Sequence, residues 1–397
     1  MHISKGRQLT YCTNVHPGED WNTTFESIKK FVPIIKKSVC PNDLFGLGLR
    51  LSNQASQELG EADRLAVFKT WLNTNGIYIF TMNGFPFGNF HDTTVKDKVH
   101  QPDWSTPKRL DYTKRLFEQL SELLPKGMSG GISTSPVSYK HWYRSKEQKE
   151  LIFKKGAKNM VLIADMLYAL EQTTGQYLHL DIEPEPDGML ENTEELIYFF
   201  DNFLISYGRE LFQEKYGLNE KECETIVKKY ITMCYDICHF SLAYEEPKNT
   251  FEKLAAKGIQ IGKIQISAAL KALFKHSNND KVWDDLAKFD EPTYLHQVTV
   301  KKPEGVTTYP DLTVVLKERN SVDELRAHFH VPIFLEKFDQ LCSTQDHILK
   351  VLDILKTQKV SEHLEIETYT WDVLPKALKQ PLSDSIIREI QWVQERL

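Results

Sequence analysis

Short apolar runs alternate with longer amphipathic patterns from one end of this 397-residue chain to the other. Between consecutive runs, apolar residues recur at the spacing of a helix, as they do from Phe25 to Ile35. Strand–helix units that follow one another without linkers predict an α/β fold, a (β/α)₈ TIM barrel that covers residues 1–397 as a single domain. The runs that predict the barrel strands are 8–15, 44–52, 77–85, 127–135, 176–184, 230–239, 262–270 and 363–371.

One segment departs from this alternation. After the seventh run, residues 293–316 have the pattern of a β-hairpin with Gly305 at its turn, and residues 324–336 contain another short strand. We expect the segment of about residues 293–336 to be an insertion over the C-terminal mouth, the end at which TIM barrels carry their active sites. A separate subdomain with its own additional strands is the alternative.

The charge balance and the hydropathy exclude several classes of protein. Lys and Arg number 49 against 55 Asp and Glu, a net charge of −6, which argues against a protein that binds nucleic acid through a basic face. No apolar run approaches the roughly 18 residues that a membrane span needs, and the first residues lack the apolar stretch of a secretion signal. The 6 cysteines are scattered and predict reduced thiols. We therefore expect a cytoplasmic protein that is not inserted in a membrane and acts on a small molecule.

Polar side chains recur on one face of several predicted strands. Because successive side chains of a strand point to opposite faces, residues two apart share a face, and here the apolar set faces the helices. The opposite, inward set comprises His179, Asp181 and Glu183 on the fifth run, Asp236 on the sixth, Lys263 and Gln265 on the seventh, and Glu365 and Glu367 on the eighth. Ionised carboxylates are costly to bury, so several that converge require cations or an aqueous cleft.

A divalent-metal site at the C-terminal mouth is the functional interpretation of this pattern. Its predicted ligands each lie near the carboxyl end of a strand: Glu183, Asp236, Gln265 and Glu367. Oxygen ligands suit Mg²⁺ or Mn²⁺, whereas an added histidine favours Zn²⁺ or Co²⁺. The structural alternative is a set of ion pairs inside the barrel with Lys263 and Arg50, which point inward by the same parity.

Histidines gather near the same strand ends. Because the chemistry of this fold is carried by the loops that follow the strands, we predict that these histidines contact the substrate. The predicted substrate-binding residues are His16, His91, His239, His328 and His330. His100 has no such context and is assigned a structural role.

The order of these motifs resembles that of the xylose isomerase-like TIM barrels, which include sugar isomerases, epimerases and endonuclease IV. The resemblance rests on Ile-Glu-Pro in the fifth strand, Asp-x-x-His after the sixth, a glutamine in the seventh and a glutamate in the eighth. It implies that Glu183, Asp236, Gln265 and Glu367 bind the metal. It also implies that His239 contacts the substrate or the metal. Asp181 departs from the expected small or apolar residue before Ile-Glu-Pro.

A closer resemblance extends over nearly the whole chain. The segments YCTNVHPGEDW, NGFPFGNFH, GISTSP, DIEPEPDG, CYDICH, KIQISAAL, HFHVP and LEIETYTWDVLP together resemble the EboE family. Its members are known as metabolite-traffic proteins and are encoded beside a prenyltransferase-like membrane protein and a sugar-cyclase-like enzyme. The resemblance implies a role in a metabolite-traffic or biosynthetic gene cluster, without fixing a reaction.

Three functions follow from these observations. The first is a metal-dependent isomerase or epimerase of a sugar-like metabolite, in which Glu183 and Glu367 move a proton through an enediolate. The second is an endonuclease IV-like phosphodiesterase with several zinc ions, for which His91, His239, His328 and His330 supply further ligands. The third is a barrel that binds a metabolite without catalysis. About one metal equivalent would favour the isomerase, and two or three would favour the phosphodiesterase.

Overall fold

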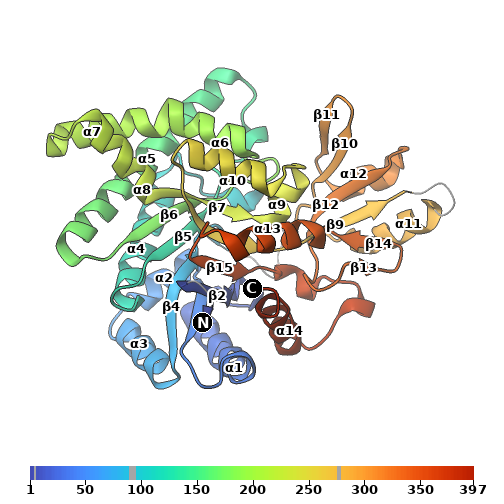
Figure 1. Ribbon diagram of the computed structural model, residues 1–397, viewed down its shortest axis with the longest axis horizontal. Coiled ribbons are helices and arrows are strands. Elements are labelled where there is room, and N and C mark those ends of the chain that lie inside the picture. Colours follow the sequence, from blue (N-terminus) through green and yellow to red (C-terminus); the bar gives the residue numbers. More distant parts are fainter. Residues whose placement is uncertain (4–5, 89–94, 275–278) are drawn as a thin grey trace.

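Eight parallel strands curl into a nearly closed barrel in the computed structural model, which describes residues 1–3, 6–88, 95–274 and 279–397 (Figure 1). The sheet order is β1-β2-β15-β8-β7-β6-β5-β4-β3, in which the short β1 (His2–Ile3) is antiparallel to β2. The barrel strands are β2 (Arg7–Tyr11), β3 (Phe45–Arg50), β4 (Ile77–Asn83), β5 (Gly130–Thr134), β6 (Leu178–Ile182), β7 (Ile231–Asp236), β8 (Ile261–Ile266) and β15 (His363–Ile366).

The parallel strands β2 and β3 approach one another where the barrel closes. Cys12 forms a parallel bridge with Gly48, and the Gly48 backbone N–H donates to Thr10 Oγ1 at 3.0 Å. A second bond runs from the Arg50 N–H to Thr13 Oγ1 at 2.8 Å. Every predicted run overlaps one barrel strand, so the predicted α/β TIM barrel is confirmed.

Helices cover the outside of the barrel (Figure 1), and local signals fix their ends. The longest, α5, begins with a capping box between Ser145 and Gln148 and ends at Gly175 in the left-handed conformation, φ 73°. The helices are α1 (Trp21–Val39), α2 (Asn53–Leu59), α3 (Arg64–Thr74), α4 (Pro107–Leu123), α5 (Lys146–Thr174), α6 (Thr193–Phe199), α7 (Ile205–Tyr216), α8 (Glu220–Tyr230), α9 (Ile237–Leu242), α10 (Pro247–Ala256), α11 (Asn279–Leu286), α12 (Leu312–Glu318), α13 (Gln345–Thr357) and α14 (Leu382–Gln394). None of these described helices has both the length and the apolar character that crossing a membrane requires.

A second sheet lies in the chain between β8 and α13 and extends to one side of the barrel (Figure 1, right). Its antiparallel strands have the order β11-β10-β12-β9-β14-β13, and the predicted hairpin is β10 paired with β11. The strands are β9 (Ala269–Leu273), β10 (Val298–Lys302), β11 (Gly305–Tyr309), β12 (Glu324–His330), β13 (Lys337–Phe338) and β14 (Leu341–Ser343).

This second sheet includes residues on both sides of the predicted insertion of 293–336. It begins with β9, because the run 262–270 contributes one strand to the barrel and one to the second sheet. Ser267 interrupts the run: its hydroxyl donates to Asp236 and accepts the Cys238 backbone N–H, so the chain leaves the barrel there. Ala269 then donates its N–H to Thr344 Oγ1 at 2.8 Å. The apolar pattern continues through both strands, so the sequence alone could not reveal the change of sheet.

The barrel interior is polar, as the strand parity predicts. Lys263 Nζ lies 2.8 Å from Glu365 Oε2, and both side chains are fully buried. Gly48 leaves room for that carboxylate, because a Cβ there would lie 1.8 Å from Glu365 Oε1. Arg50, the other cation expected in such pairs, donates to the backbone carbonyls of Gly18 and Gly88 and pairs with Glu19 at 3.5 Å, all in loops outside the barrel interior. The predicted interior ion pairing is therefore found for Lys263, whereas Arg50 is held by loops.

Candidate metal centre

Three predicted ligands, Glu183, Asp236 and Glu367, converge at the C-terminal mouth. Asp236 is the last residue of β7, and the two glutamates directly follow β6 and β15. Their candidate ligand oxygens all lie within 4.8 Å of one another, and their side chains are buried. Parallel strands of a barrel bring their carboxyl ends to one mouth, which is why three residues so distant in sequence meet.

Two of the three carboxylates are each held through one oxygen. Glu367 Oε1 accepts hydrogen bonds from the amides of Asn14 at 2.7 Å and Asn83 at 2.9 Å. Asp236 Oδ1 accepts from the Ser267 hydroxyl at 2.7 Å and from the His239 backbone N–H at 3.1 Å. Among the described residues, Asp236 Oδ2 and Glu183 Oε2 have no hydrogen-bond partner, although both are buried. Buried carboxylate oxygens without hydrogen-bond partners are suitable ligands for a divalent cation.

Burial and mutual repulsion set the protonation of this cluster. Burial, followed by the nearby charges of Glu367 and Asp236, raises the pKa of Glu183 well above its usual range. Burial and the charge of Asp236 do the same to the pKa of Glu367. Burial also pushes the pKa of Asp236 upward, but the imidazoles of His239 and His330, together with the hydrogen bonds from Ser267 and the His239 N–H, hold that pKa below its usual value. Without a cation, the two glutamates therefore retain their protons to a higher pH than exposed glutamates do.

Gln265, the fourth predicted ligand, lies next to Asp236 in the register of β7 and β8. Its Oε1 is 3.3 Å from the Sγ of Cys234, which donates to it. Its part in metal binding stays a prediction.

Three predicted histidines lie beside the carboxylates. His239 Nε2 is 3.0 Å from His328 Nε2, and candidate ligand atoms of Asp236, His239 and His330 lie within 4.8 Å of one another. Burial lowers the pKa of His330 to about 4 and, together with the neighbouring imidazoles, lowers that of His328 well below its usual value. Both rings are therefore neutral near pH 7. The second sheet thus brings two neutral imidazoles to the acidic cluster.

Of the remaining two predicted histidines, the structure describes His16 only. The His16 ring stacks on Phe31 of α1 with ring centroids 4.5 Å apart, and its Nε2 lies 2.9 Å from the Tyr11 hydroxyl. His16 is not among the described residues that line the pocket at the mouth, and this packing is typical of a core histidine. His91 lies outside the described residues.

The pocket at the mouth also contains residues that sequence reasoning missed. His100, which was expected to be structural, lines it, and its Nε2 lies 2.9 Å from Glu185 Oε1. Asn83 ends β4 on the inward parity and could have been found there. Asn14 and His100 lie in short 3₁₀ turns within the loops after strands, where the sequence has no periodic signal. The described lining residues are Asn14, Asn83, Phe85, Pro86, Val95, Lys96, Val99, His100, Glu183, Glu185, His239, Tyr294, Leu295, Gln297, His328, Glu367 and Tyr369.

The sequence matches no protein-family model. No curated protein is detectably related to it by sequence. Solved structures do match over the whole chain. A xylose isomerase-like TIM barrel protein from Mycobacterium smegmatis, in complex with magnesium, has a TM-score of 0.50 and 8% identity over 100% of this chain and 98% of that one. This likeness and the strand order show that the chain has the fold of the xylose isomerase-like TIM barrels.

Two further structures are similar at slightly lower scores. The probable 3-DHS dehydratase AsbF of Bacillus anthracis, involved in petrobactin synthesis, has a TM-score of 0.48 and 11% identity, over 97% of each chain. The IolI protein with a bound zinc atom has a TM-score of 0.45 and 12% identity, over 97% of this chain and 96% of that one.

Proposed function

We propose that this protein is a divalent-metal-dependent isomerase or epimerase of a sugar-like metabolite. The convergence of Glu183, Asp236 and Glu367 at the mouth of the barrel is the observation that carries the proposal. These three residues would hold the cation, with Gln265 as a further ligand. Carboxylate oxygens suit Mg²⁺ or Mn²⁺, and the neighbouring imidazoles also make Zn²⁺ a candidate.

The two glutamates are suited to moving a proton between the carbons of a bound sugar. A bound divalent cation would polarise the carbonyl and hydroxyl oxygens of the substrate. One glutamate then takes the proton next to the carbonyl, and the other returns a proton through an enediolate. Asn14 and Asn83 fix Glu367 through Oε1, whereas Glu183 Oε2 has no hydrogen-bond partner among the described residues. This difference favours Glu183 as the group that first takes the proton.

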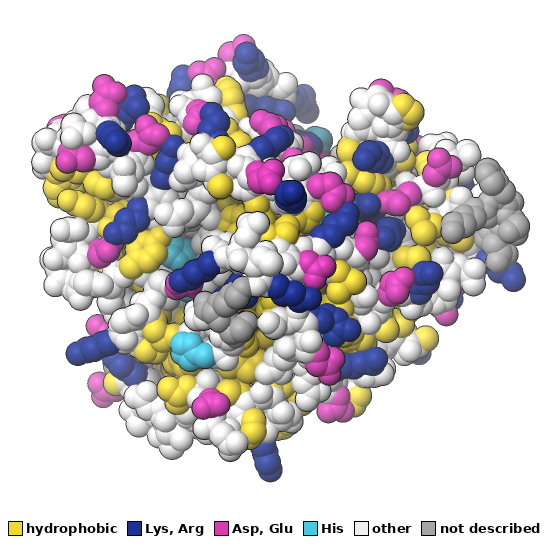
Figure 2. All heavy atoms as spheres, viewed as in Figure 1, with side chains coloured by type: hydrophobic (Ala, Val, Ile, Leu, Met, Phe, Trp, Pro, Cys, Tyr) yellow, Lys and Arg dark blue, Asp and Glu magenta, His cyan; other side chains and the backbone are white. Residues whose placement is uncertain are grey.

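The walls of the pocket favour a small polyol over a nucleic acid. Phe85, Tyr294 and Tyr369 offer apolar faces on which the C–H groups of a sugar ring can pack. The net charge is −6, and acidic and basic side chains are interspersed on the face drawn in Figure 2, a distribution unlike the basic face of a nucleic-acid binder. We propose that His239, which lines the pocket, contacts the substrate, and we infer a cytoplasmic location.

We infer that the chain belongs to the EboE family. Three segments that carry the resemblance also supply the candidate site: DIEPEPDG contains Glu183 and Glu185, CYDICH contains Asp236 and His239, and HFHVP contains His328 and His330. Such an overlap is expected if the family shares a metal-dependent reaction in metabolite traffic.

The histidines beside the carboxylates favour a second candidate, a phosphodiesterase with several zinc ions. His239, His328 and His330 lie close enough to the acidic cluster to enlarge it into a centre for more than one ion. Metal bound at the carboxylates separates the candidates. One equivalent that is lost in Glu183→Gln supports a single-metal isomerase, whereas two or three equivalents that are lost together in that variant support the phosphodiesterase.

The first prediction concerns metal affinity. Replacing Glu183 with glutamine (Glu183→Gln) removes an anionic ligand but keeps the side-chain volume. We expect the affinity for Mn²⁺ to fall by at least about tenfold, since even loss of a hydrogen-bonded partner of a ligand costs about 10–100-fold in metal affinity. Isothermal titration of the chelator-stripped protein with Mn²⁺ measures the change.

Glu389→Gln is the matched control for this titration. Glu389 is equally buried, and burial raises its pKa to about 8, but it bonds Thr368 and the Ile333 backbone N–H outside the cluster. Wild-type affinity in Glu183→Gln, or equal losses in both variants, would contradict the assignment.

The second prediction concerns pH. The folded, metal-free protein keeps protons on Glu183 and Glu367 that the unfolded chain releases near its usual glutamate pKa of about 4.3. Their contribution to stability therefore falls as the pH rises above that value, and Mn²⁺, which displaces the protons, stabilises the protein more at high pH than at low pH. Thermal unfolding from pH 5 to 8, with chelator or with Mn²⁺, checks this. A stabilisation by Mn²⁺ that is the same at every pH would contradict it.

A further inference from the structure

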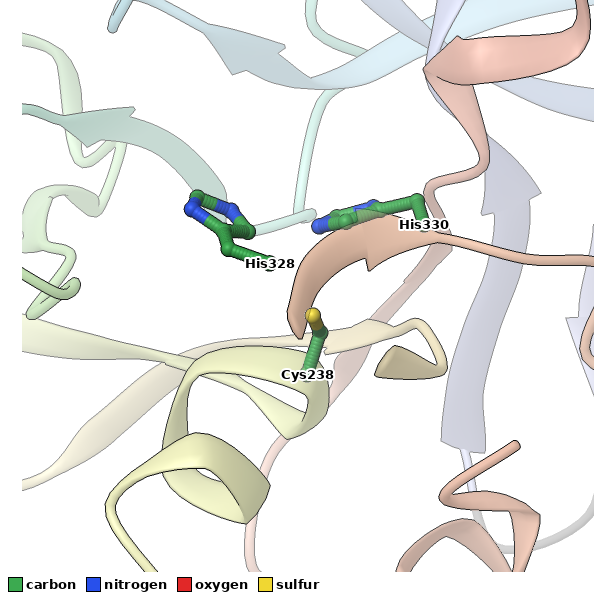
Figure 3. A group of neighbouring side chains, drawn as sticks. All are labelled: Cys238, His328 and His330. Atoms are coloured by element: carbon green, nitrogen blue, oxygen red, sulfur yellow. The ribbon is translucent and has the colours of Figure 1, made fainter. Parts of the chain in front are cut away.

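The proposed reaction gives no role to a buried thiol beside the histidines. Cys238 on α9 points toward the imidazoles of His328 and His330 on β12 (Figure 3). Candidate ligand atoms of these three residues lie within 4.8 Å of one another, and their side chains are 0%, 7% and 0% exposed. The Cys238 backbone is fixed by its N–H bond to Ser267 Oγ at 2.9 Å. A sulfur and two imidazole nitrogens thus meet where water has little access.

Hydrogen bonds assign the protons of these imidazoles. His330 Nδ1 lies 2.7 Å from the backbone carbonyl of Glu367, and a carbonyl only accepts, so Nδ1 carries the proton. His328 Nδ1 lies 3.0 Å from Gln297 Oε1, and Gln297 is oriented by its own Nε2 donating to the Pro186 carbonyl. In both rings the bond made by Nδ1 leaves Nε2 as the nitrogen that can face a metal ion.

The same argument applies to the adjacent His239. Its Nδ1 lies 3.0 Å from the Pro184 carbonyl and donates to it, which directs Nε2 into the cluster. This Nε2 is 3.0 Å from His328 Nε2. His330 Nε2 has no hydrogen-bond partner among the described residues. Imidazoles with Nδ1 bonded to a carbonyl and Nε2 directed into a cluster have the arrangement of metal ligands.

We propose that Cys238, His328 and His330 bind a second cation of the thiolate-preferring class, such as Zn²⁺, with His239 Nε2 beside it. A thiolate and imidazoles select Zn²⁺ over Mg²⁺ or Mn²⁺, which prefer the carboxylates of the first centre. On binding, the S–H bond of Cys238 breaks, the sulfur keeps the electron pair for the bond to the metal, and the proton passes to the buffer. This proposal does not depend on the reaction proposed above.

Cobalt provides the test, because Co²⁺ bound by a thiolate absorbs in the near ultraviolet and Co²⁺ bound by carboxylates alone does not show that band. The full-length protein is stripped with chelator and titrated with Co²⁺. We expect two bound equivalents and a thiolate-to-cobalt band in the wild type, and we expect Cys238→Ser to lose the band and one equivalent. Circular dichroism verifies that the variant is folded.

Cys234→Ser is the control, because Cys234 lies four residues earlier and its thiol contacts Gln265. It should keep the band. Glu183→Gln separates this proposal from the proposed function, since it should lose the carboxylate-bound equivalent and keep the band. Absence of the band from the wild type, or its loss in Cys234→Ser but not in Cys238→Ser, would overturn the proposal. The wild-type result does not depend on the folding of any variant.

Discussion

Replacing Glu367 with glutamine (Glu367→Gln) is expected to lower turnover by about 10²–10⁴-fold, the usual effect of losing a general acid or base. The amide keeps the volume and one oxygen, so Asn14 and Asn83 can still donate to it, but the anion and its basicity are lost. Turnover is measured on the sugar that a screen of aldoses and ketoses identifies, and Mn²⁺ affinity is measured in parallel.

Glu365→Gln is the matched comparison, because Glu365 lies two residues earlier on the same inward face and pairs with Lys263 deeper in the barrel. This change should mainly lower stability. Equal losses of turnover in the two variants, with unchanged folding, would contradict an active centre at the strand ends.

Removal of Lys263 should have the largest effect on stability. Lys263 Nζ pairs with Glu365 and also donates to the Met82 carbonyl at 3.1 Å and to Ser133 Oγ at 3.2 Å. Burial alone would lower the pKa of Lys263, but the charge of Glu365 raises that pKa above its usual value, so the lysine is charged. Lys263→Met leaves Glu365 buried without this cation, and such a loss typically costs about 3–5 kcal/mol in the free energy of unfolding. Chemical denaturation measures it.

Two further variants serve as controls for that measurement. The exposed pair Lys350–Glu246 has side chains 45% and 54% exposed, so Lys350→Met should cost less than about 1 kcal/mol. The double variant Lys263→Met with Glu365→Leu should recover much of the stability, because no unpaired charge remains. If Lys263→Met lowers the free energy of unfolding no more than Lys350→Met does, the interior ion pair does not stabilise the barrel.

The convergence of the carboxylates could be predicted because it depends only on regular structure. A period of two directs Asp181 and Glu183 inward on the same strand, and a parallel barrel brings the ends of β6, β7 and β15 to one mouth. No information on loops is needed for that step. The polar interior around Lys263 follows from the same rule.

The remainder of the site depends on segments without periodicity. Asn14 and His100 reach the pocket from loops, where no repeating pattern indicates which side chain points inward. Arg50 has the inward parity, but its long side chain reaches loop carbonyls that the parity does not describe. His16 follows a strand, as a site residue would, yet it stacks on α1, because the direction taken by a chain after its strand is set by packing.

The most direct test of the metal centre is the position of the metal in crystals grown with Mn²⁺. An anomalous difference map collected near the manganese absorption edge should show a peak bounded by oxygens of Glu183, Asp236 and Glu367 at the roughly 2.0–2.6 Å distances of hard cations. Crystals of Glu183→Gln should show a weaker peak or none. A map of fully loaded wild-type crystals without a peak between these three carboxylates, or with manganese bound only elsewhere, would contradict the account.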